Sequence, residues 1–302
     1  MSITIIGYED GEAALTWSGL TDALAKGHAL PKAEISDTFL YRDPDTLLSR
    51  SAWIDGLGVA VKSATIFPGN KAKGQPAVNG SVSMFSDENG ELEALVDFHL
   101  VTKWKTAGDS LYAAKLLANP NPETILIVGT GTVAGNMIDA YRSAFPDARY
   151  IVWGRNRDYS AEFAKAHGAT SVTDLADGIQ QAQIICTATM ATDPVLKGEW
   201  LQPGQHLDLI GAYRPDMREV DDEALQRARI FVDSFETTLD HIGELKIPLA
   251  SGAISRGDIL GDFYDPSVFK RAPDDITICK NGGGAHLDLM TCRYIIDQWK
   301  PK

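Results

Sequence analysis

Apolar runs alternate with helix-compatible segments through the second half of the chain. The run Thr124–Val128 is typical of a strand buried on both faces of a sheet. Similar runs predict further strands, and helical segments separate most of them. Alternation of this kind predicts an α/β fold with a parallel, doubly wound sheet of the Rossmann type. The further strands are expected at residues 150–153, 184–188, 206–211 and 229–234.

The first part of the chain has a different period. Leucines at helical spacing predict a helix over residues 11–26, with Gly27 as its stop. Residues 59–98 are rich in β-branched side chains and predict strands, with a hairpin turn at residues 87–90. This part therefore predicts a smaller α+β domain.

A proline-rich linker divides the chain. We expect Thr102 to cap a helix that ends before the linker at residues 119–122, because paired prolines stop a helix and stiffen the chain. The first domain is therefore expected at residues 1–120 and the Rossmann domain at residues 121–285. A helix predicted at residues 286–302 is expected to return to the first domain.

A loop with G-x-G-x-x-A spacing follows the first strand of the second domain. Gly129 permits the tight turn, Gly131 lets the backbone approach a pyrophosphate, and Ala134 lets the next helix pack on the strand. That helix starts at Thr132 and Val133, and its N-terminus would face the phosphates. Because strand, turn and helix occur in the required order, we favour dinucleotide binding over an incidental glycine turn.

A second set of expected cofactor residues ends the strand at residues 184–188. Ligands of doubly wound sheets gather at the carboxyl ends of the strands. We therefore expect Thr187, Ala188 and Thr189 to line the nicotinamide side of the site.

The tip of the strand at residues 150–153 bears on which nucleotide is bound. NAD-binding folds usually place a carboxylate there, which accepts from the ribose hydroxyls. This chain has Arg155, Asn156 and Arg157 instead, and guanidinium groups suit a 2′-phosphate. We expect NADP(H) as the preferred cofactor and NAD(H) as the alternative. The competing interpretation is a solvated loop, since Asp158 follows closely.

Composition excludes several classes of protein. The 302 residues carry a formal charge of −13, which disfavours binding to nucleic acid or to an anionic membrane. No apolar run reaches membrane-spanning length, and no signal-peptide pattern opens the chain. The 3 cysteines are widely spaced and the 6 histidines show no ligand spacing. We therefore expect reduced thiols, no metal and a cytoplasmic location.

Several short motifs together resemble the ornithine cyclodeaminase/mu-crystallin family. The resemblance extends over nearly the whole chain, and it implies dimeric NAD(P)-dependent enzymes that act on amino acids or their imines. It also implies that the first domain supplies substrate and dimer contacts. The motifs are Gly58–Lys62, Phe67–Asn70, Val101–Ala107, the glycine loop, Arg214–Asp221 and Lys280–Asp288.

The resemblance also assigns roles to three lysines. Lys62 matches the family lysine beside the substrate carboxylate, and a lysine within an apolar strand is costly unless paired, so we expect a catalytic role rather than a surface one. Lys105 stands where the family has arginine. It is expected in the first turn of a helix, where a cation is unfavourable unless an anion shares the site. Lys32 replaces a second family arginine. Lys105 and Lys32 are therefore expected to bind the substrate carboxylate, with an exposed lysine as the alternative.

Two further positions distinguish branches of the family. Tyr213 stands where cyclodeaminases carry an aspartate as general base, so ornithine deamination lacks its obvious proton acceptor. Tyr213 is expected either to contact the substrate or to pack as an aromatic. The glycine run at residues 282–284 implies close approach of the Gly283 backbone to the ligand, or else a simple turn.

The resemblance implies an NAD(P)H-dependent reductase of a small cyclic α-imino acid such as Δ1-pyrroline-2-carboxylate, giving an L-amino acid such as proline. The continuation from Arg214 to Glu219 is closer to the ketimine-reducing branch. Three alternatives stay open: ornithine cyclodeaminase with bound NAD and release of ammonia, an amino-acid dehydrogenase of the alanine type, and a non-catalytic NADPH-binding protein.

Overall fold

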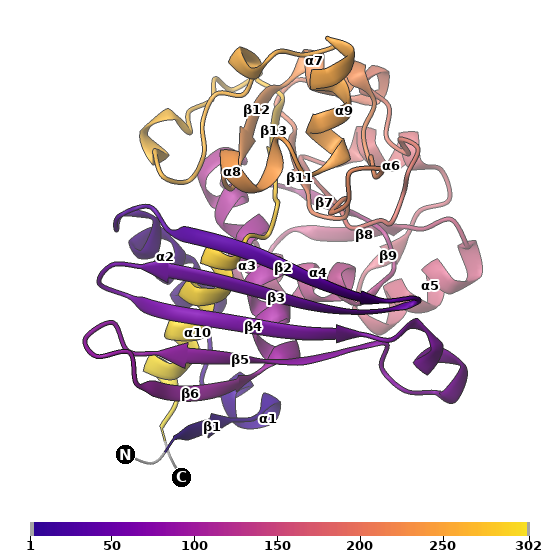
Figure 1. Cartoon of the computed structure of the whole chain (residues 1–302). Coiled ribbons are helices and arrows are strands. Elements are labelled where there is room, and N and C mark those ends of the chain that lie inside the picture. The colour runs from indigo at the N-terminus through magenta and orange to yellow at the C-terminus, as the bar shows by residue number, and fades with distance from the viewer. Residues whose placement is uncertain (1–2, 301–302) are drawn as a thin grey trace. The chain divides into compact units, whose positions relative to one another are not determined.

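The computed structural model describes residues 3–300, except for the side chain of Lys71, and the chain forms two compact units. Residues 1, 2, 301 and 302, which belong to the expected first domain and C-terminal helix, lie outside the described residues. Unit 1 contains the chain up to Lys105 and from Gly284 onward, and unit 2 is Thr106–Gly283. Helix α3 (Phe98–Leu117) contributes to both units, as Figure 1 allows the reader to follow by colour.

Unit 1 is built on one sheet with the strand order β1-β6-β5-β4-β3-β2. Strands β2 to β6 pair in antiparallel fashion with their chain neighbours, and β1 pairs in parallel with β6. The predicted hairpin turn between β5 and β6 is confirmed, with Gly90 at φ +72°. The strands are β1 (Thr4–Ile6), β2 (Glu34–Arg42), β3 (Asp45–Ile54), β4 (Gly58–Ile66), β5 (Val78–Phe85) and β6 (Leu92–Asp97).

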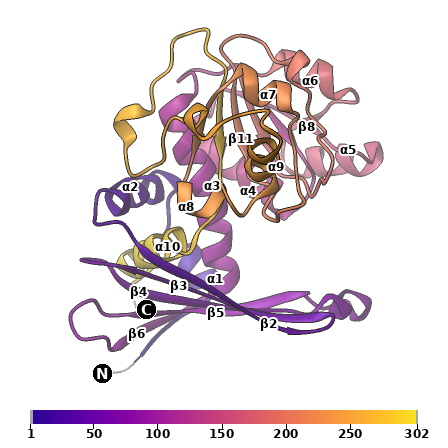
Figure 2. The ribbon, with the colours of Figure 1, turned by 45° about the horizontal axis from the view of Figure 1, so that its top comes forward.

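Helix α10 (Ala285–Gln298) packs on one face of this sheet, and α2 (Trp17–His28) packs on α10 (Figure 2). Along β4 the side chains alternate between buried and half-buried, and Lys62 is one of the buried ones. Successive side chains of a strand point to opposite faces, so Lys62 lies on the face that α10 covers. The other face of the sheet carries the half-buried set.

The helix expected at residues 11–26 is wrong in its bounds. The chain forms a short α1 (Tyr8–Glu12) and then α2, because Thr16 caps α2 by accepting a hydrogen bond from the Gly19 N–H at 3.1 Å. Gly27 does not end α2. It lies inside the helix, where a Cβ would come within 2.6 Å of Met290 on α10, so this glycine permits a close contact between two helices.

The expected start of α3 at Thr102 is also wrong. The helix begins at Phe98, where the Asp97 carboxylate accepts from the Leu100 N–H at 2.8 Å. Lys105 therefore lies in the second turn, beyond the strongest effect of the helix dipole. The C-terminal helix ends at Gln298 instead of continuing, since a proline follows at position 301 in the sequence and residues before proline avoid the helical conformation.

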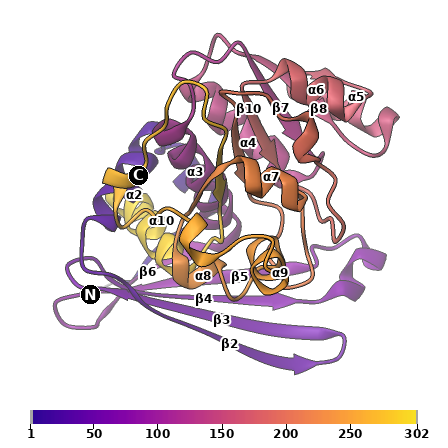
Figure 3. The ribbon, with the colours of Figure 1, turned by 90° about the horizontal axis from the view of Figure 1, so that it is seen from above.

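Unit 2 confirms the predicted doubly wound α/β fold, because its sheet is parallel throughout with the order β12-β13-β11-β10-β7-β8-β9. Helices α5 and α6 lie beside β8 (Figures 1 and 3). The strands are β7 (Thr124–Val128), β8 (Arg149–Trp153), β9 (Thr170–Ser171), β10 (Ile184–Thr187), β11 (His206–Leu209), β12 (Arg229–Val232) and β13 (Thr277–Lys280). The helices are α4 (Thr132–Ala144), α5 (Arg157–Ala166), α6 (Leu175–Gln181), α7 (Asp222–Arg227), α8 (Phe235–Thr238) and α9 (Gly243–Ser251).

The strand order of unit 2 changes direction at β7. From there the chain adds β8 and β9 on one side, and then β10 and β11 on the other. In such sheets ligands bind at the carboxyl ends of the strands where the direction changes. Within residues 3–300, no helix has both the length and the apolar character needed to cross a bilayer.

Candidate active site

The glycine loop after β7 has the geometry that its sequence predicts. Gly129 has φ +129°, and a Cβ there would lie 2.6 Å from the Ala188 carbonyl oxygen, so the position requires glycine. Gly131 caps α4 without a side-chain hydrogen bond, and a Cβ on it would meet no atom within 4 Å. The N-terminus of α4 therefore has no side-chain cap and has open space beside Gly131, which fits a pyrophosphate.

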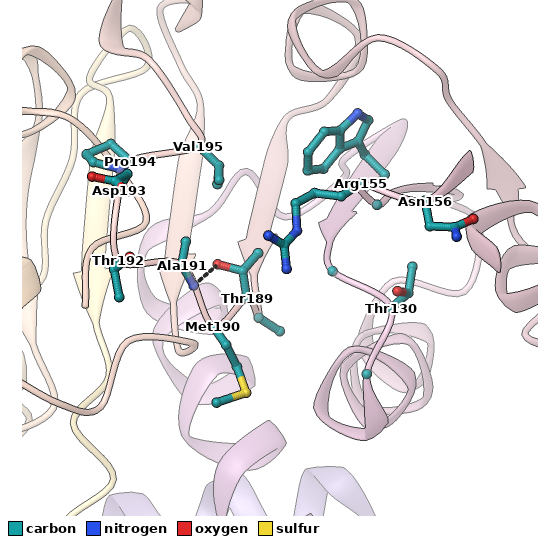
Figure 4. Close-up of a pocket in the computed structure, with 15 residues that line it drawn as sticks. Thr130, Arg155, Asn156, Thr189, Met190, Ala191, Thr192, Asp193, Pro194 and Val195 are labelled. Carbon is teal, nitrogen blue, oxygen red and sulfur yellow. Dashed lines mark hydrogen bonds between the residues drawn. The ribbon is translucent and has the colours of Figure 1, made fainter. Parts of the chain in front are cut away.

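A pocket of about 660 Å³ opens at the carboxyl ends of β7, β8 and β10 (Figure 4). Three loops form its walls, and they bring together six of the ten expected cofactor residues. These six are Gly129, Gly131, Arg155, Asn156, Ala188 and Thr189. The other four, Thr132, Val133, Arg157 and Thr187, adjoin the pocket in sequence but do not line it.

The β8 side of the pocket is basic. Figure 4 shows the Arg155 side chain reaching toward the loop that contains Thr189, with Asn156 on the opposite side. Asn156 also caps α5, since its side-chain oxygen accepts from the Tyr159 N–H at 3.0 Å. The carboxylate in the pocket wall belongs to Asp193, on the loop after β10, and not to the tip of β8.

Other pocket residues were missed from the sequence. Thr130, Trp153 and Met190 line the pocket, and Met190 is 67% exposed. Their positions directly after β7, at the end of β8 and shortly after β10 are the available signal, because carboxyl ends of parallel strands form ligand sites.

A buried carboxylate fixes the wall that contains Thr189. Glu219 is fully buried and accepts from the Thr189 N–H at 2.8 Å and from its hydroxyl at 2.7 Å. It also accepts from the N–H groups of Gly211 at 2.7 Å and Ala212 at 3.2 Å. The loops after β10 and β11 are thereby tied together by one side chain.

A second buried carboxylate supports the first. Glu244 accepts from the Glu219 N–H at 2.7 Å and from the Val220 N–H at 3.1 Å. Burial, and then the nearby Glu219 charge, raise the pKa of Glu244 to about 7. Sequence reasoning gave neither glutamate a place beside the nucleotide pocket.

Unit 1 holds a separate cluster of charged side chains around Lys62. The Lys62 ammonium donates to the Asp288 carboxylate at 2.8 Å and to the Thr102 hydroxyl at 2.9 Å. Lys105 Nζ lies 3.9 Å from the same Asp288 oxygen. The side chains of Lys62, Asp288 and Lys105 are 7%, 2% and 8% exposed, so the charges are almost entirely removed from water.

Burial and neighbouring charge perturb this pair. Burial lowers the pKa of Lys62 to about 8, because the attraction of Asp288 only partly offsets desolvation. Burial alone would raise the pKa of Asp288, but Lys105, Lys62 and Arg50 outweigh it and hold that pKa below its ordinary range. Of the described residues, none donates a hydrogen bond to Asp288 Oδ2. A buried acceptor oxygen therefore stands beside a proton donor.

Asp288 was missed as a site residue although it lies in a motif of the family. It is 226 positions from Lys62 in the chain, so only the fold brings the two together. The local signal is a carboxylate in the first turn of a helix whose first eight residues are all buried.

The remaining expected substrate residues are placed as follows. Lys32 is exposed, between α2 and β2. Tyr213 is 57% exposed, with the Arg214 guanidinium 5.8 Å from its ring centre, so it is not a core aromatic. Gly283 has φ +69°, and its N–H donates to Asp233 at 2.7 Å, which closes a turn after β13.

Comparison with known proteins identifies the class. A sequence model of the ornithine cyclodeaminase/mu-crystallin family matches residues 54–302, and the chain belongs to that family. The resemblance seen in the sequence motifs is thereby confirmed.

Individual relatives narrow the comparison. The chain is 47% identical over 300 residues to Δ1-pyrroline-2-carboxylate reductase of Paracoccus denitrificans, covering 96% of this chain and 95% of that protein. It is 31% identical to mouse ketimine reductase mu-crystallin, covering 80% of this chain and 76% of that protein. The fold matches Thermococcus litoralis Δ1-pyrroline-2-carboxylate reductase, solved with NADH and L-proline, with a TM-score of 0.88 at 24% identity over 98% of this chain and 97% of that one.

The two glycines of the loop after β7 give contrasting predictions. Gly129→Ala forces a positive φ and a contact with the Ala188 carbonyl, so it should destabilise the protein by about 2 kcal/mol or more. Gly131→Ala meets no protein atom, so it should cost less than about 1 kcal/mol and weaken dinucleotide binding at least about tenfold. Thermal unfolding and calorimetric titration with NADPH measure the two effects. Equal loss of stability in both variants would contradict the assignment.

Proposed function

We propose that this protein is an NAD(P)H-dependent reductase that converts Δ1-pyrroline-2-carboxylate to L-proline. The observation that carries the proposal is the buried Lys62–Asp288 pair. The Lys62 ammonium is a proton donor, and no described residue donates a hydrogen bond to Asp288 Oδ2, so the pair suits reduction of a C=N bond. It occurs in a chain that is 47% identical, along almost its whole length, to a Δ1-pyrroline-2-carboxylate reductase.

The loop after β7 and the uncapped N-terminus of α4 would hold the dinucleotide, which when bound supplies the hydride for reduction of the imine carbon. Glu219 holds the Thr189 loop of the pocket in place through its hydrogen bonds. A wall that is fixed before the ligand arrives lowers the cost of binding.

The protein's own contribution to the chemistry is charge and a proton. The Lys62 ammonium donates its proton to the imine nitrogen, so the ring nitrogen becomes an amine as the carbon gains hydride. Asp288 holds Lys62 through Oδ1, and its Oδ2 accepts from the N–H that the reaction creates. A pKa of about 8 keeps Lys62 protonated at neutral pH while making the proton easier to give up.

Cyclodeamination of ornithine is disfavoured by Tyr213. A phenol that is 57% exposed replaces the aspartate expected as general base, so the carboxylate that would accept the proton is missing at this position. The reductive assignment needs no base at this position.

The decisive assay follows the loss of dihydronicotinamide absorbance with Δ1-pyrroline-2-carboxylate, with L-ornithine and NAD in a parallel reaction. Oxidation of the reduced cofactor with formation of L-proline is expected. Ammonia release from ornithine without imine reduction would establish cyclodeamination instead. Tight NADPH binding with neither reaction would establish a binding protein.

Lys62→Met should lower kcat for imine reduction at least about 100-fold while the protein stays folded, because it removes the proton donor. In the wild type, kcat/KM for reduction should fall as the pH rises through about 8, where the Lys62 ammonium loses its proton. The pH–rate profile and circular dichroism check both statements.

Lys62→Arg is the matched control for that profile, because arginine keeps its charge at every accessible pH. Its residual activity should lack the decline near pH 8. A decline that persists unchanged in Lys62→Arg would assign the titration to another group or to the substrate.

For the cofactor we propose a preference for NADP(H) over NAD(H). The support is the basic β8 side of the pocket, where Arg155 and Asn156 take the place of a carboxylate. A guanidinium can bind a 2′-phosphate through charge-assisted hydrogen bonds. Arg157 adjoins this wall at the start of α5 and adds positive charge to it.

Arg155→Ala should raise KM for NADPH about 10- to 100-fold and change KM for NADH less than about threefold, since NADH has no 2′-phosphate. Lys165→Ala, which removes an exposed positive charge from the far end of α5, is the charge-matched control. Steady-state kinetics with both cofactors decide. Equal effects of Arg155→Ala on NADPH and NADH would contradict the preference.

We further propose a homodimer formed through the open face of the sheet of unit 1. The register places Ile5, Leu40, Trp53 and Val61 on that face, and the first three are 72%, 63% and 54% exposed. Large apolar side chains gathered on one exposed face are typical of an interface.

Trp53→Glu should convert a dimer to a monomer, because a charge would be buried without a partner at the interface. Light scattering of wild type and variant measures the mass. A wild-type protein that is monomeric at micromolar concentration would contradict the proposed dimer.

A further inference from the structure

Three charged residues stand opposite one another across neighbouring strands of unit 1. Asp37 on β2 pairs with Arg50 on β3, and Arg50 pairs with Lys62 on β4. Beyond Lys62 the same row continues with Val82 and Val96. The charge is therefore confined to one end of the row, on the face that α10 covers.

Two cations in directly opposed positions are costly. Cβ atoms of such antiparallel partners lie about 5 Å apart, and like charges there destabilise the sheet. The side chains of Arg50 and Lys62 are only 23% and 7% exposed, so water screens their repulsion weakly. Arg50 also contributes to the lowered pKa of Lys62 and of Asp288, which places its charge within electrostatic reach of both.

The Arg50 guanidinium is held in a fixed orientation. Its Nε lies 3.0 and 3.1 Å from the two Asp37 carboxylate oxygens, and its Nη2 lies 2.8 Å from one of them. This two-pronged contact fixes the plane of the guanidinium before any ligand arrives. An oriented guanidinium loses less freedom when it binds a second carboxylate.

The cluster defined by Asp37, Arg50, Lys62, Lys105 and Asp288 contains three cations and two carboxylates, an excess of one positive charge. A substrate with one carboxylate balances that excess. Lys62 already donates to Asp288 and Thr102. Since the proposed reduction assigns Lys62 to the imine nitrogen, Arg50 and Lys105 are the cations of the cluster that are left for the carboxylate.

We propose that Arg50, positioned by Asp37, binds the carboxylate of the imino acid together with Lys105 and makes the enzyme selective for α-carboxylates. The inference rests on the proposed reduction of an imino acid and adds the residue that selects the substrate. It assigns to Arg50 the role that family resemblance gave to Lys32, which is exposed outside the sheet.

The test compares a charged substrate with a neutral analogue. Arg50→Gln should lower kcat/KM for Δ1-pyrroline-2-carboxylate about 100-fold and for the corresponding carboxamide less than about threefold. Arg50→Lys keeps the charge but loses the two-pronged guanidinium contact, so it should lower kcat/KM for Δ1-pyrroline-2-carboxylate by about tenfold. Asp37→Asn should raise KM for the carboxylate with little change in kcat, because it releases the guanidinium without removing it.

Arg42→Gln is the matched control, since Arg42 is an arginine of β2 that pairs with Asp45 and is 77% exposed. Arg42→Gln should leave kcat/KM for both the carboxylate and the carboxamide unchanged. If Arg50→Gln does not fold, the comparison is made with Arg50→Lys and Asp37→Asn. The proposal would be overturned if both of these variants kept the wild-type selectivity for the carboxylate.

A binding measurement separates this inference from the proposed function. L-Proline and L-prolinamide are titrated into the wild type and Arg50→Gln in the presence of NADP⁺. Arg50-dependent binding of proline without turnover of the imino acid would sink the proposed reaction and support the carboxylate site. Turnover with selectivity unchanged in Arg50→Gln, or absence of proline binding in the wild type, would overturn the role of Arg50.

Discussion

The ion pair between Lys62 and Asp288 is the constraint on which unit 1 depends. Removing two charges from water costs several kcal/mol for each ion, and the pair persists only because hydrogen bonds and further charges surround it. The Thr102 hydroxyl takes a second Lys62 hydrogen bond, and Lys105 lies 3.9 Å from Asp288. The pair also joins a strand to a helix 226 positions further along the chain. Hydrophobic packing of α10 on the sheet therefore cannot slip without leaving a buried charge alone.

Two buried carboxylates of unit 2 are stabilised by backbone hydrogen bonds. Glu219 and Glu244 are both fully buried, and each accepts hydrogen bonds from backbone N–H groups of neighbouring loops. Backbone donors cannot move away or change protonation, so the loops after β10 and β11 are held in one arrangement. In unit 1 the hydrogen bonds between the buried charges come from side chains, whereas in unit 2 backbone donors hold the wall of the pocket. This division suits a proton-transfer cluster in one unit and a nucleotide pocket in the other.

The sequence predicted features that depend on neighbouring residues. The glycine loop, the strands of unit 2 and the hairpin before β6 follow from local spacing, and Gly129 has the positive φ that its turn requires. Helix starts were predicted less well, because Asp97 and Thr16 compete with other capping residues nearby. Asp288 and Arg50 were missed because their partners are distant in the chain or lie on a strand that alternation did not reveal. β2 carries exposed apolar residues on both faces, with Phe39 and Tyr41 on one and Leu40 on the other, so its period-two pattern is weak.

Arg50 explains how the proposed site can have a lysine at position 105. A lysine holds a carboxylate as a point charge and leaves its orientation free, whereas a guanidinium fixes it in two directions. In the proposed site, a lysine at position 105 in place of a family arginine would leave α3 without directional recognition of the carboxylate. The sheet can restore it, because Arg50 is already fixed by Asp37 and lies directly opposite Lys62 in the register. A carboxylate oriented from the sheet would place the adjoining C=N bond by covalent geometry, so Lys62 and Asp288 would not need to orient the substrate and would act on it only through the proton.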